Sequence, residues 1–98
     1  MRVEISPLAE RDLEAIGDDI AEDSPSRALS FVAELRTQCA TIVKAPQAYR
    51  ARADIAEGLR SCAYGNYVIF FTITKTQLKI VRILHGARDI AAQFIGPK

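Results

Sequence analysis

Residues 58–89 read GLRSCAYGNYVIFFTITKTQLKIVRILHGARD, and this stretch decides the fold. Two runs within it, 59–64 and 67–74, read as strands, and the second is rich in the β-branched and aromatic side chains that favour a central strand. Gly65-Asn66 separates the runs, and glycine accepts the positive φ that a two-residue hairpin turn requires. The pattern therefore predicts a β-hairpin at the centre of a sheet.

A third run, 78–84, follows the turn 75–77 and predicts a third consecutive strand. The turn lengths set the register of the three strands. The expected pairs are Tyr64 with Tyr67, Cys62 with Ile69, Arg60 with Phe71, Phe71 with Ile80, and Ile69 with Arg82.

This register divides the side chains between two faces of the sheet, and a slip of one residue in either hairpin would exchange them. One face carries Arg60, Cys62, Tyr64, Tyr67, Ile69, Phe71, Ile73, Leu78, Ile80, Arg82 and Leu84. The other carries Leu59, Ser61, Ala63, Val68, Phe70, Thr72, Lys79, Val81, Ile83 and His85. Both faces are apolar, so we expect one to pack on the protein's own helices and the other to need a different cover.

The first half of the chain predicts a short strand at residues 1–5 and then two helices. Ser6-Pro7 and Ser24-Pro25 each pair an N-cap residue with a proline at the first helical position. Apolar residues recur at helical spacing at Ala9, Leu13, Ile16 and Ile20, and again at Ala28, Phe31, Val32, Leu35, Cys39 and Ile42. We expect the second helix to end near Lys44, residues 46–57 to form a loop, and residues 89–95 to be a short helix or an extended tail. Helices followed by strands predict an α+β fold with two layers and a single domain, residues 1–98.

The composition is that of an ordinary globular protein, with 49% hydrophobic and 26% charged residues. Cys39 and Cys62 lack a CxxC spacing, and we expect both to be buried free thiols. One histidine and two separated cysteines argue against a metal site, and no cofactor motif is present. The chain shows neither a signal-peptide pattern nor a membrane-spanning apolar run, so we expect a cytoplasmic protein and no membrane partner.

Charge is unevenly distributed along the chain. Residues 1–49 hold five basic and nine acidic side chains, a net charge of −4, whereas residues 50–98 hold eight basic and three acidic ones, a net charge of +5. The basic half falls short of the charge of a dedicated nucleic-acid binder, so we expect no direct sequence-specific binding to nucleic acid.

Five motifs together resemble the ParE branch of the RelE/ParE toxin superfamily. They are Ser6-Pro7 with Ala9, Asp12 and Leu13; Pro25 with Ala28 and Phe31; Gly58-Leu59-Arg60; residues 65–71, GNYVIFF; and residues 82–89, RILHGARD. The resemblance spans nearly the whole chain. It implies a β-α-α-β-β-β fold in which a helical hairpin packs on one face of a small, mainly antiparallel sheet, with a short C-terminal helix or tail.

The resemblance also implies function. RelE-branch toxins are ribosome-dependent endoribonucleases that cut messenger RNA, whereas ParE-branch toxins poison DNA gyrase. Each toxin is held inactive by a co-encoded antitoxin, which in the ParE branch usually carries a ribbon-helix-helix DNA-binding domain. The chain is therefore expected to form a hetero-oligomer with a ParD-like antitoxin and to act on gyrase.

The residues at the nuclease positions favour the ParE branch. RNA cleavage by 2′-OH attack requires charge stabilisation and proton transfer, which RelE-type nucleases obtain from basic residues and a C-terminal tyrosine. On the resemblance, these positions fall at Leu59, Ser61, Val68, Arg88 and Phe94. Only Arg88 retains suitable chemistry, so we expect no catalytic residue and a non-enzymatic inhibitor. The alternatives are a RelE-type nuclease with a rearranged site and a non-toxic homologue that only binds its antitoxin.

Two sets of contact residues are expected. The candidate target contacts are Arg60, Arg82, His85, Arg88, Asp89 and Phe94, with residues 85–95 as the toxic surface. The candidate antitoxin contacts are the apolar residues Leu59, Val68, Phe70, Val81 and Ile83, which lie on the face left uncovered by the helices. Structural roles compete with contact roles at three of these positions: a solvated head for Arg60, an ion pair with Asp89 or an acid of the first helix for Arg82, and a turn cap for His85.

Overall fold

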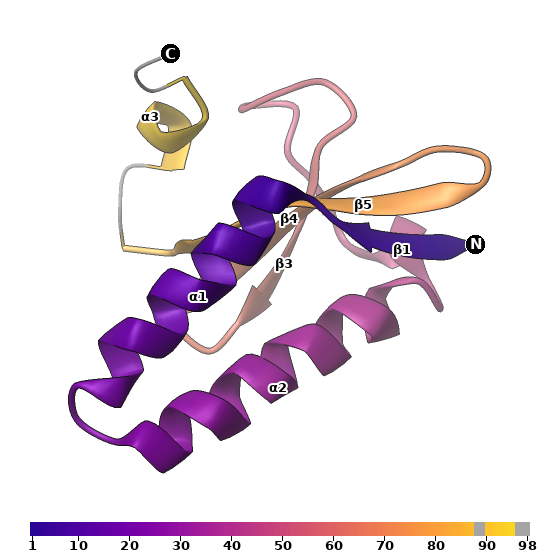
Figure 1. Ribbon diagram of the computed structural model, residues 1–98. Coiled ribbons are helices and arrows are strands. Elements are labelled where there is room, and N and C mark those ends of the chain that lie inside the picture. The colour runs from indigo at the N-terminus through magenta and orange to yellow at the C-terminus, as the bar shows by residue number, and fades with distance from the viewer. Residues whose placement is uncertain (88–89, 96–98) are drawn as a thin grey trace.

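The computed structural model describes residues 1–87 and 90–95, and it is an α+β fold in which helices cover a five-stranded mixed sheet (Figure 1). Its elements in order are β1 (Arg2–Ile5), α1 (Pro7–Ala21), α2 (Pro25–Ile42), the 3₁₀ helix η1 (Pro46–Ala48), β2 (Arg50–Ala51), β3 (Arg60–Tyr64), β4 (Tyr67–Ile73), β5 (Gln77–His85) and α3 (Ile90–Ile95). The α1–α2 hairpin covers one face of the sheet, and α3 packs on the other.

Both helix starts are confirmed at the predicted serines. The Ser6 side chain accepts a hydrogen bond from the Ala9 amide at 3.1 Å, and the Ser24 side chain accepts one from the Arg27 amide at 3.2 Å. Each bond satisfies an amide that has no partner inside the helix, which fixes where the helix begins.

The strand order is β1-β5-β4-β3-β2, with β1 parallel to β5 and every other pair antiparallel. Gly65 has φ +58°, as in a two-residue turn with glycine at its first position, and the first hairpin has the predicted register. The edge strand β2 lies in the segment that we expected to be a loop. Its two residues carry no apolar alternation that the sequence could reveal.

The predicted register of the second hairpin is wrong beyond Phe71. Phe71 pairs with Ile80 as expected, but Phe70, which precedes it in β4, pairs with Arg82, so that Val81 is an extra residue in β5. Ile69 therefore pairs with Ile83 and not with Arg82, as the prediction had it. Such a bulge moves the residues that follow it to the opposite face of the sheet. Ile83 therefore lies in the core beneath the helices, 1% exposed, not on the other face where the prediction placed it.

The same register shift also reverses the sheet faces that were predicted for Leu84 and His85. Leu84 packs on the face of the sheet away from the α1–α2 hairpin, and His85 pairs with Tyr67 on the helix side.

The main core lies between the hairpin and the sheet. Its buried members are Ala9, Leu13, Ile16, Phe31, Leu35, Cys39, Ile42, Cys62, Ile69, Phe71, Leu78, Ile80 and Ile83. Both cysteines are buried free thiols, as predicted. A Cβ at Gly17 would lie 3.3 Å from a methyl of Val32, so this glycine allows α1 to approach α2 closely. Within the part of the chain that the structure describes, no helix is long and apolar enough to cross a membrane.

Candidate functional site

The sheet face opposite the α1–α2 hairpin carries a second apolar cluster, and α3 covers it. Leu59, Phe70 and Leu84 are buried there, and the partly buried side chains packed against them are Ile55, Val68, Val81, Ile90 and Phe94. The Phe94 ring stands edge-on to Phe70, with 5.0 Å between ring centroids. This arrangement buries the centre of the face without any second chain.

The expectation of an uncovered face is therefore wrong. Phe70 is fully buried and Leu59 is 3% exposed, whereas Val68 and Val81 remain half-buried. Residues 89–95 were expected to be a short helix or an extended tail, and the helix α3 at Ile90–Ile95 supplies the missing cover. Antitoxin contact at Leu59, Val68, Phe70 and Val81 stays a prediction, and such contact at Phe70 would require α3 to move.

Four of the five positions aligned with the nuclease residues come together on this face, and the fifth, Arg88, lies outside the described residues. Leu59, Val68 and Phe94 belong to the same apolar cluster, and Ser61 pairs with Phe70 in the adjacent strand. A cation beside them is Arg52, whose guanidinium lies 5.6 Å from the Phe70 ring and is bound to Asp54 at 3.0 Å. An apolar cluster of this kind can bind another apolar surface, but its side chains cannot transfer a proton.

Arg82 forms the structural ion pair that its apolar neighbours had suggested, and its partner is Asp12 of α1. The Asp12 carboxylate accepts from Nε and Nη2 of Arg82 at 2.8 and 2.9 Å, and also from the Ile83 amide at 2.9 Å. This hydrogen bonding raises the pKa of the Arg82 guanidinium. Since β1 pairs with β5 only as far as Ile80, Asp12 replaces the missing strand along the next part of the β5 edge.

His85 and Arg60 also have local structural partners. His85 Nδ1 accepts a hydrogen bond from the Ala87 amide at 3.1 Å, which confirms the expected turn cap. Arg60 donates to the Tyr49 carbonyl at 2.7 Å and so attaches β3 to the segment before β2. Candidate contacts Arg88 and Asp89 lie outside the described residues. The structure thus groups Phe94 with the apolar cluster, while Arg60 lies apart from it.

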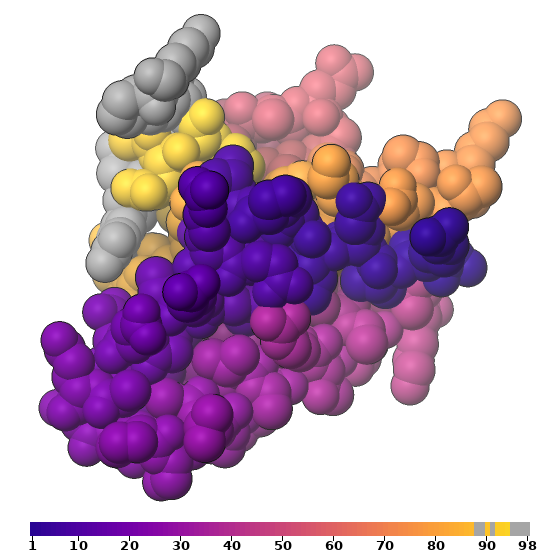
Figure 2. Space-filling view, viewed as in Figure 1, coloured from indigo at the N-terminus to yellow at the C-terminus, as the bar shows by residue number. Residues whose placement is uncertain are grey.

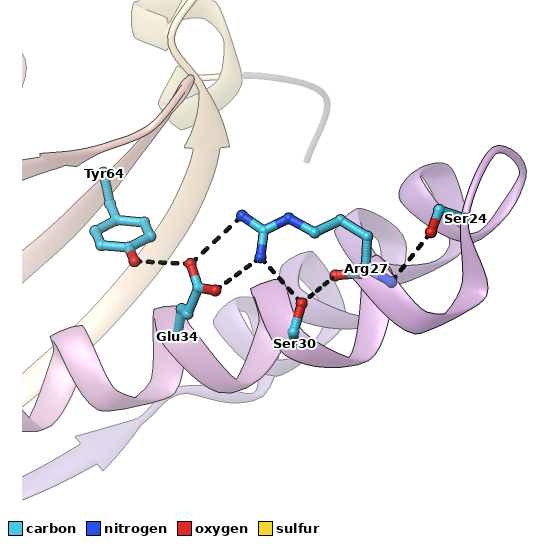
Figure 3. A network of polar contacts seen from close by, with 5 residues as sticks. All are labelled: Ser24, Arg27, Ser30, Glu34 and Tyr64. Carbon is cyan, nitrogen blue, oxygen red and sulfur yellow. Dashed lines mark hydrogen bonds and ion pairs between the residues drawn. The ribbon is translucent and has the colours of Figure 1, made fainter.

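A polar network that the sequence analysis missed joins α2 to the β3–β4 hairpin (Figure 3). The Glu34 carboxylate accepts from Arg27 at 2.7 Å and from the Tyr64 hydroxyl at 2.9 Å, and Arg27 also donates to Ser30. Hydrogen bonds from Arg27 and then Tyr64 lower the pKa of Glu34. The sequence signal was the seven-residue spacing of Arg27 and Glu34, which places both on one side of α2.

An apolar groove of about 660 Å³ runs between α1 and α2. Its lining residues are Glu10, Leu13, Glu14, Gly17, Asp18, Ala21, Pro25, Ala28, Leu29, Val32 and Arg36. The two helices occupy this face of the molecule in the space-filling view (Figure 2). The sequence signal for the groove was the row of acids four residues apart beside the small residues Gly17 and Ala21.

The fold is that of the ParE/RelE-like toxins. A chain of the chromosomal ParDE toxin–antitoxin system from P. aeruginosa matches with TM-score 0.75 and 22% identity, over 87% of this chain and 95% of that one. A chain of the toxin–antitoxin complex RelBE2 from Mycobacterium tuberculosis matches with TM-score 0.64 and 22% identity, over 86% and 95% of the two chains. No curated protein sequence matches.

The family follows from the sequence itself. The family model described as the ParE toxin of the type II toxin–antitoxin system parDE matches residues 3–90. The chain therefore belongs to the ParE toxin family of type II toxin–antitoxin systems.

Proposed function

We propose that this toxin stops growth by binding DNA gyrase and interfering with its strand-passage cycle, without performing covalent chemistry itself. The observation that carries the proposal is the apolar filling of the sheet face beneath α3. Leu59 and Phe94 pack there around a fully buried Phe70, at the face where a RelE-type nuclease would hold its basic residues and tyrosine.

The chemistry of RNA cleavage supports this choice. A developing phosphorane needs cations or preorganised donors, and the 2′-OH proton needs a base. Arg82 is held by Asp12 on α1, and Arg52 is paired with Asp54. Both guanidinium groups are already bound to carboxylates, and the apolar side chains of the cluster cannot bind phosphate.

The proposal includes a ParD-like ribbon-helix-helix antitoxin as the inhibitory partner and the cytoplasm as the place of action, because gyrase works there. Solved chains with this fold come from a ParDE system and from a RelBE2 complex, which supports an antitoxin partner for this chain as well.

The direct test is a supercoiling and DNA-cleavage assay with gyrase and the purified, antitoxin-free chain. We expect lost supercoiling or accumulated cut DNA, and reversal of either on addition of the antitoxin. Arg88→Glu tests residues 85–95 as the target surface and should weaken inhibition. Lys75→Glu is the matched control, because Lys75 is exposed in the turn at the opposite end of β5.

Two results would contradict the proposal. Normal gyrase activity in the presence of a chain that still arrests growth would shift the assignment to message cleavage on ribosomes, which a translation-coupled RNA assay detects. Absence of growth arrest on expression, with antitoxin binding retained, would instead identify a non-toxic antitoxin-binding homologue.

A further inference from the structure

The two edges of the sheet differ in how far they are protected. At one edge, β2 is only two residues long, and so short a strand offers few free backbone groups to another chain. At the other edge, β1 is four residues long and pairs with β5 on one side only (Figure 1). Its pairing with β5 is regular, so the strand lies straight along the edge. An open edge of this kind is a template for a further strand.

Alternate residues of β1 turn their backbone groups toward the open edge. The Arg2 and Ser6 amides donate to carbonyls at and just before β5, at 3.1 and 2.9 Å. Since successive residues of a strand point their backbone groups to opposite sides, those of Val3 and Ile5 point away from the sheet. Neither of these two amides has a hydrogen-bond acceptor among the residues that the structure describes. They are therefore available to a second strand.

The sheet face of β1 that lies away from the hairpin carries two charges of opposite sign. Arg2 and Glu4 are both exposed, and neither forms an ion pair with any residue in the described part of the chain. Glu4 accepts a hydrogen bond from the Gln77 side chain, which leaves its charge uncompensated. A cation and an anion two residues apart on one strand are complementary to a reversed copy of the same strand.

Backbone and charge together select one register for such a pair. When two copies of β1 run antiparallel with Val3 opposite Val3, the outward backbone groups of both can bond reciprocally. Arg2 of each copy then lies opposite Glu4 of the other, at positions where the Cα atoms are about 4.5 Å apart. A slip of two residues would instead oppose Arg2 to Arg2 or Glu4 to Glu4, and like charges directly opposite are destabilising.

The same register covers apolar side chains and keeps the helices apart. Met1 is 58% exposed, and Val3 and Ile5 are only partly buried on the hairpin side of the sheet. Met1 of each copy would lie opposite Ile5 of the other, so both would gain cover. Because β1 leads into α1 at its C-terminal end, an antiparallel pair places the two α1 helices at opposite ends of the interface.

We propose that the antitoxin-free chain forms a symmetric dimer through β1, in which the two five-stranded sheets join edge to edge. Main-chain hydrogen bonds centred on Val3 hold the strands together, and two Arg2–Glu4 ion pairs fix their register. A strand of this length buries too little surface for an obligate dimer, so the association is reversible, with a dissociation constant in the micromolar range. The dimer does not depend on the target or on the antitoxin proposed above.

The first test is a charge exchange, read by sedimentation velocity of the purified chain over a series of micromolar concentrations. Arg2→Glu and Glu4→Arg should each weaken dimerisation about tenfold or more, because each opposes like charges in both halves of the interface. The double variant restores opposite charges and should return to within about threefold of the original chain. Arg50→Glu is the matched control, because it makes the same charge change at an exposed position of β2, on the other edge.

The second test removes one backbone donor. Val3→Pro deletes the central outward amide and should abolish the dimer, while the monomer keeps its circular dichroism spectrum, because that amide does not bond to β5. Val3→Ala loses similar side-chain packing but keeps the amide, and it should dimerise within about threefold of the original chain. In the original chain, hydrogen exchange at the Val3 amide should slow as the concentration rises.

Three results would overturn the proposal. A chain that stays monomeric throughout the concentration series has no such dimer. A dimer that persists in Val3→Pro, or that leaves exchange at the Val3 amide unchanged, uses another surface. Failure of the double charge variant to recover, when each single variant has lost affinity, would show that the two charges do not face each other across the edge.

Discussion

Asp12 holds α1 against β5 through three hydrogen bonds, two from Arg82 and one from the Ile83 amide. The side chains of Asp12 and Arg82 are 13% and 20% exposed, so water screens the pair only weakly. A buried charge whose partner is removed keeps the full cost of its desolvation. The pair therefore maintains the packing of the α1–α2 hairpin on the sheet. Replacing both partners by apolar groups would lower the free energy of unfolding far less than removing one of them.

We expect Asp12→Ala to lower the free energy of unfolding by about 3 kcal/mol, because it leaves both a guanidinium and a backbone amide without their acceptor. Glu10→Ala is the matched control. It removes an ion pair whose side chains are nearly half exposed, and it should cost about 0.5 kcal/mol or less. Urea unfolding measures both values. Equal costs for the two variants would show that burial adds nothing to the Asp12 pair.

The need for this pair was predictable from sequence, but its full geometry was not. Arg82 among apolar neighbours required an acid, and α1 was one of the two places expected to supply it. The hydrogen bond that Asp12 accepts from the Ile83 amide depends on where β1 leaves β5, and that point is set by tertiary packing. The Glu34–Tyr64 bond joins residues thirty positions apart and was hidden for the same reason.

Glu34 provides a pH-dependent test of that bond. Hydrogen bonds from Arg27 and Tyr64 lower the pKa of Glu34, so its stabilising effect is present above the ordinary pKa of a glutamate and is lost as the pH falls through the lowered value. Tyr64→Phe removes one donor and should raise the pKa of Glu34 toward its ordinary value, as measured by NMR titration of the side-chain carboxyl. Tyr49→Phe should leave that pKa unchanged. An unaltered Glu34 pKa in Tyr64→Phe would show that the Tyr64 bond does not form in solution.

Among the elements, β5 shows what periodicity can and cannot predict. The alternation of residues 78–84 identified the strand and its pairing near Phe71, but a two-residue period contains no signal for an extra residue. Val81 is that residue, and it reverses the faces of Ile83 and Leu84. The helix starts were easier to predict, because Ser-Pro acts through local hydrogen bonds that do not depend on the rest of the fold.

The short helix α3 is stabilised by the apolar cluster that it covers. Since six residues are too few to form a stable helix alone, we expect Phe94→Ala to detach α3 and leave the sheet intact. The loss should be about 1–2 kcal/mol, compared with about 3–5 kcal/mol for Phe71→Ala in the main core. Hydrogen exchange at the α3 amides should accelerate, and a hydrophobic dye should bind newly exposed Phe70. Unchanged exchange in α3 would contradict this anchoring role.

At the scale of the whole molecule, the two cysteines report on global opening. Burial raises the pKa of Cys39 to about 11, and the thiol of Cys62 nearby adds to the shift. Both side chains lie in the main core between α2 and the sheet. Because the thiolate is the reactive form, a thiol buried in the core reacts only when the core opens.

We therefore expect both thiols to react with a disulfide reagent at one common slow rate near pH 8, and rapidly in denaturant. The common rate should increase in Asp12→Ala, whose unfolded population is larger. Fast labelling of one cysteine in the native chain would show that its end of the core opens locally.

Because β1 pairs in parallel with β5, the chain can complete its fold only after both strands have been synthesised. Residues 2–5 pair with residues 77–80, so β1 cannot pair in the sheet until residues 77–80 have been synthesised. Until then the hairpin has no sheet to pack on, and Asp12 has neither Arg82 nor the Ile83 amide to bind. A message truncated before codon 80 thus encodes a chain that proteases and chaperones would remove, not a weakened toxin. Frameshifts upstream of the codons for residues 77–80 should therefore abolish toxicity, so a cell that has lost the antitoxin should tolerate them.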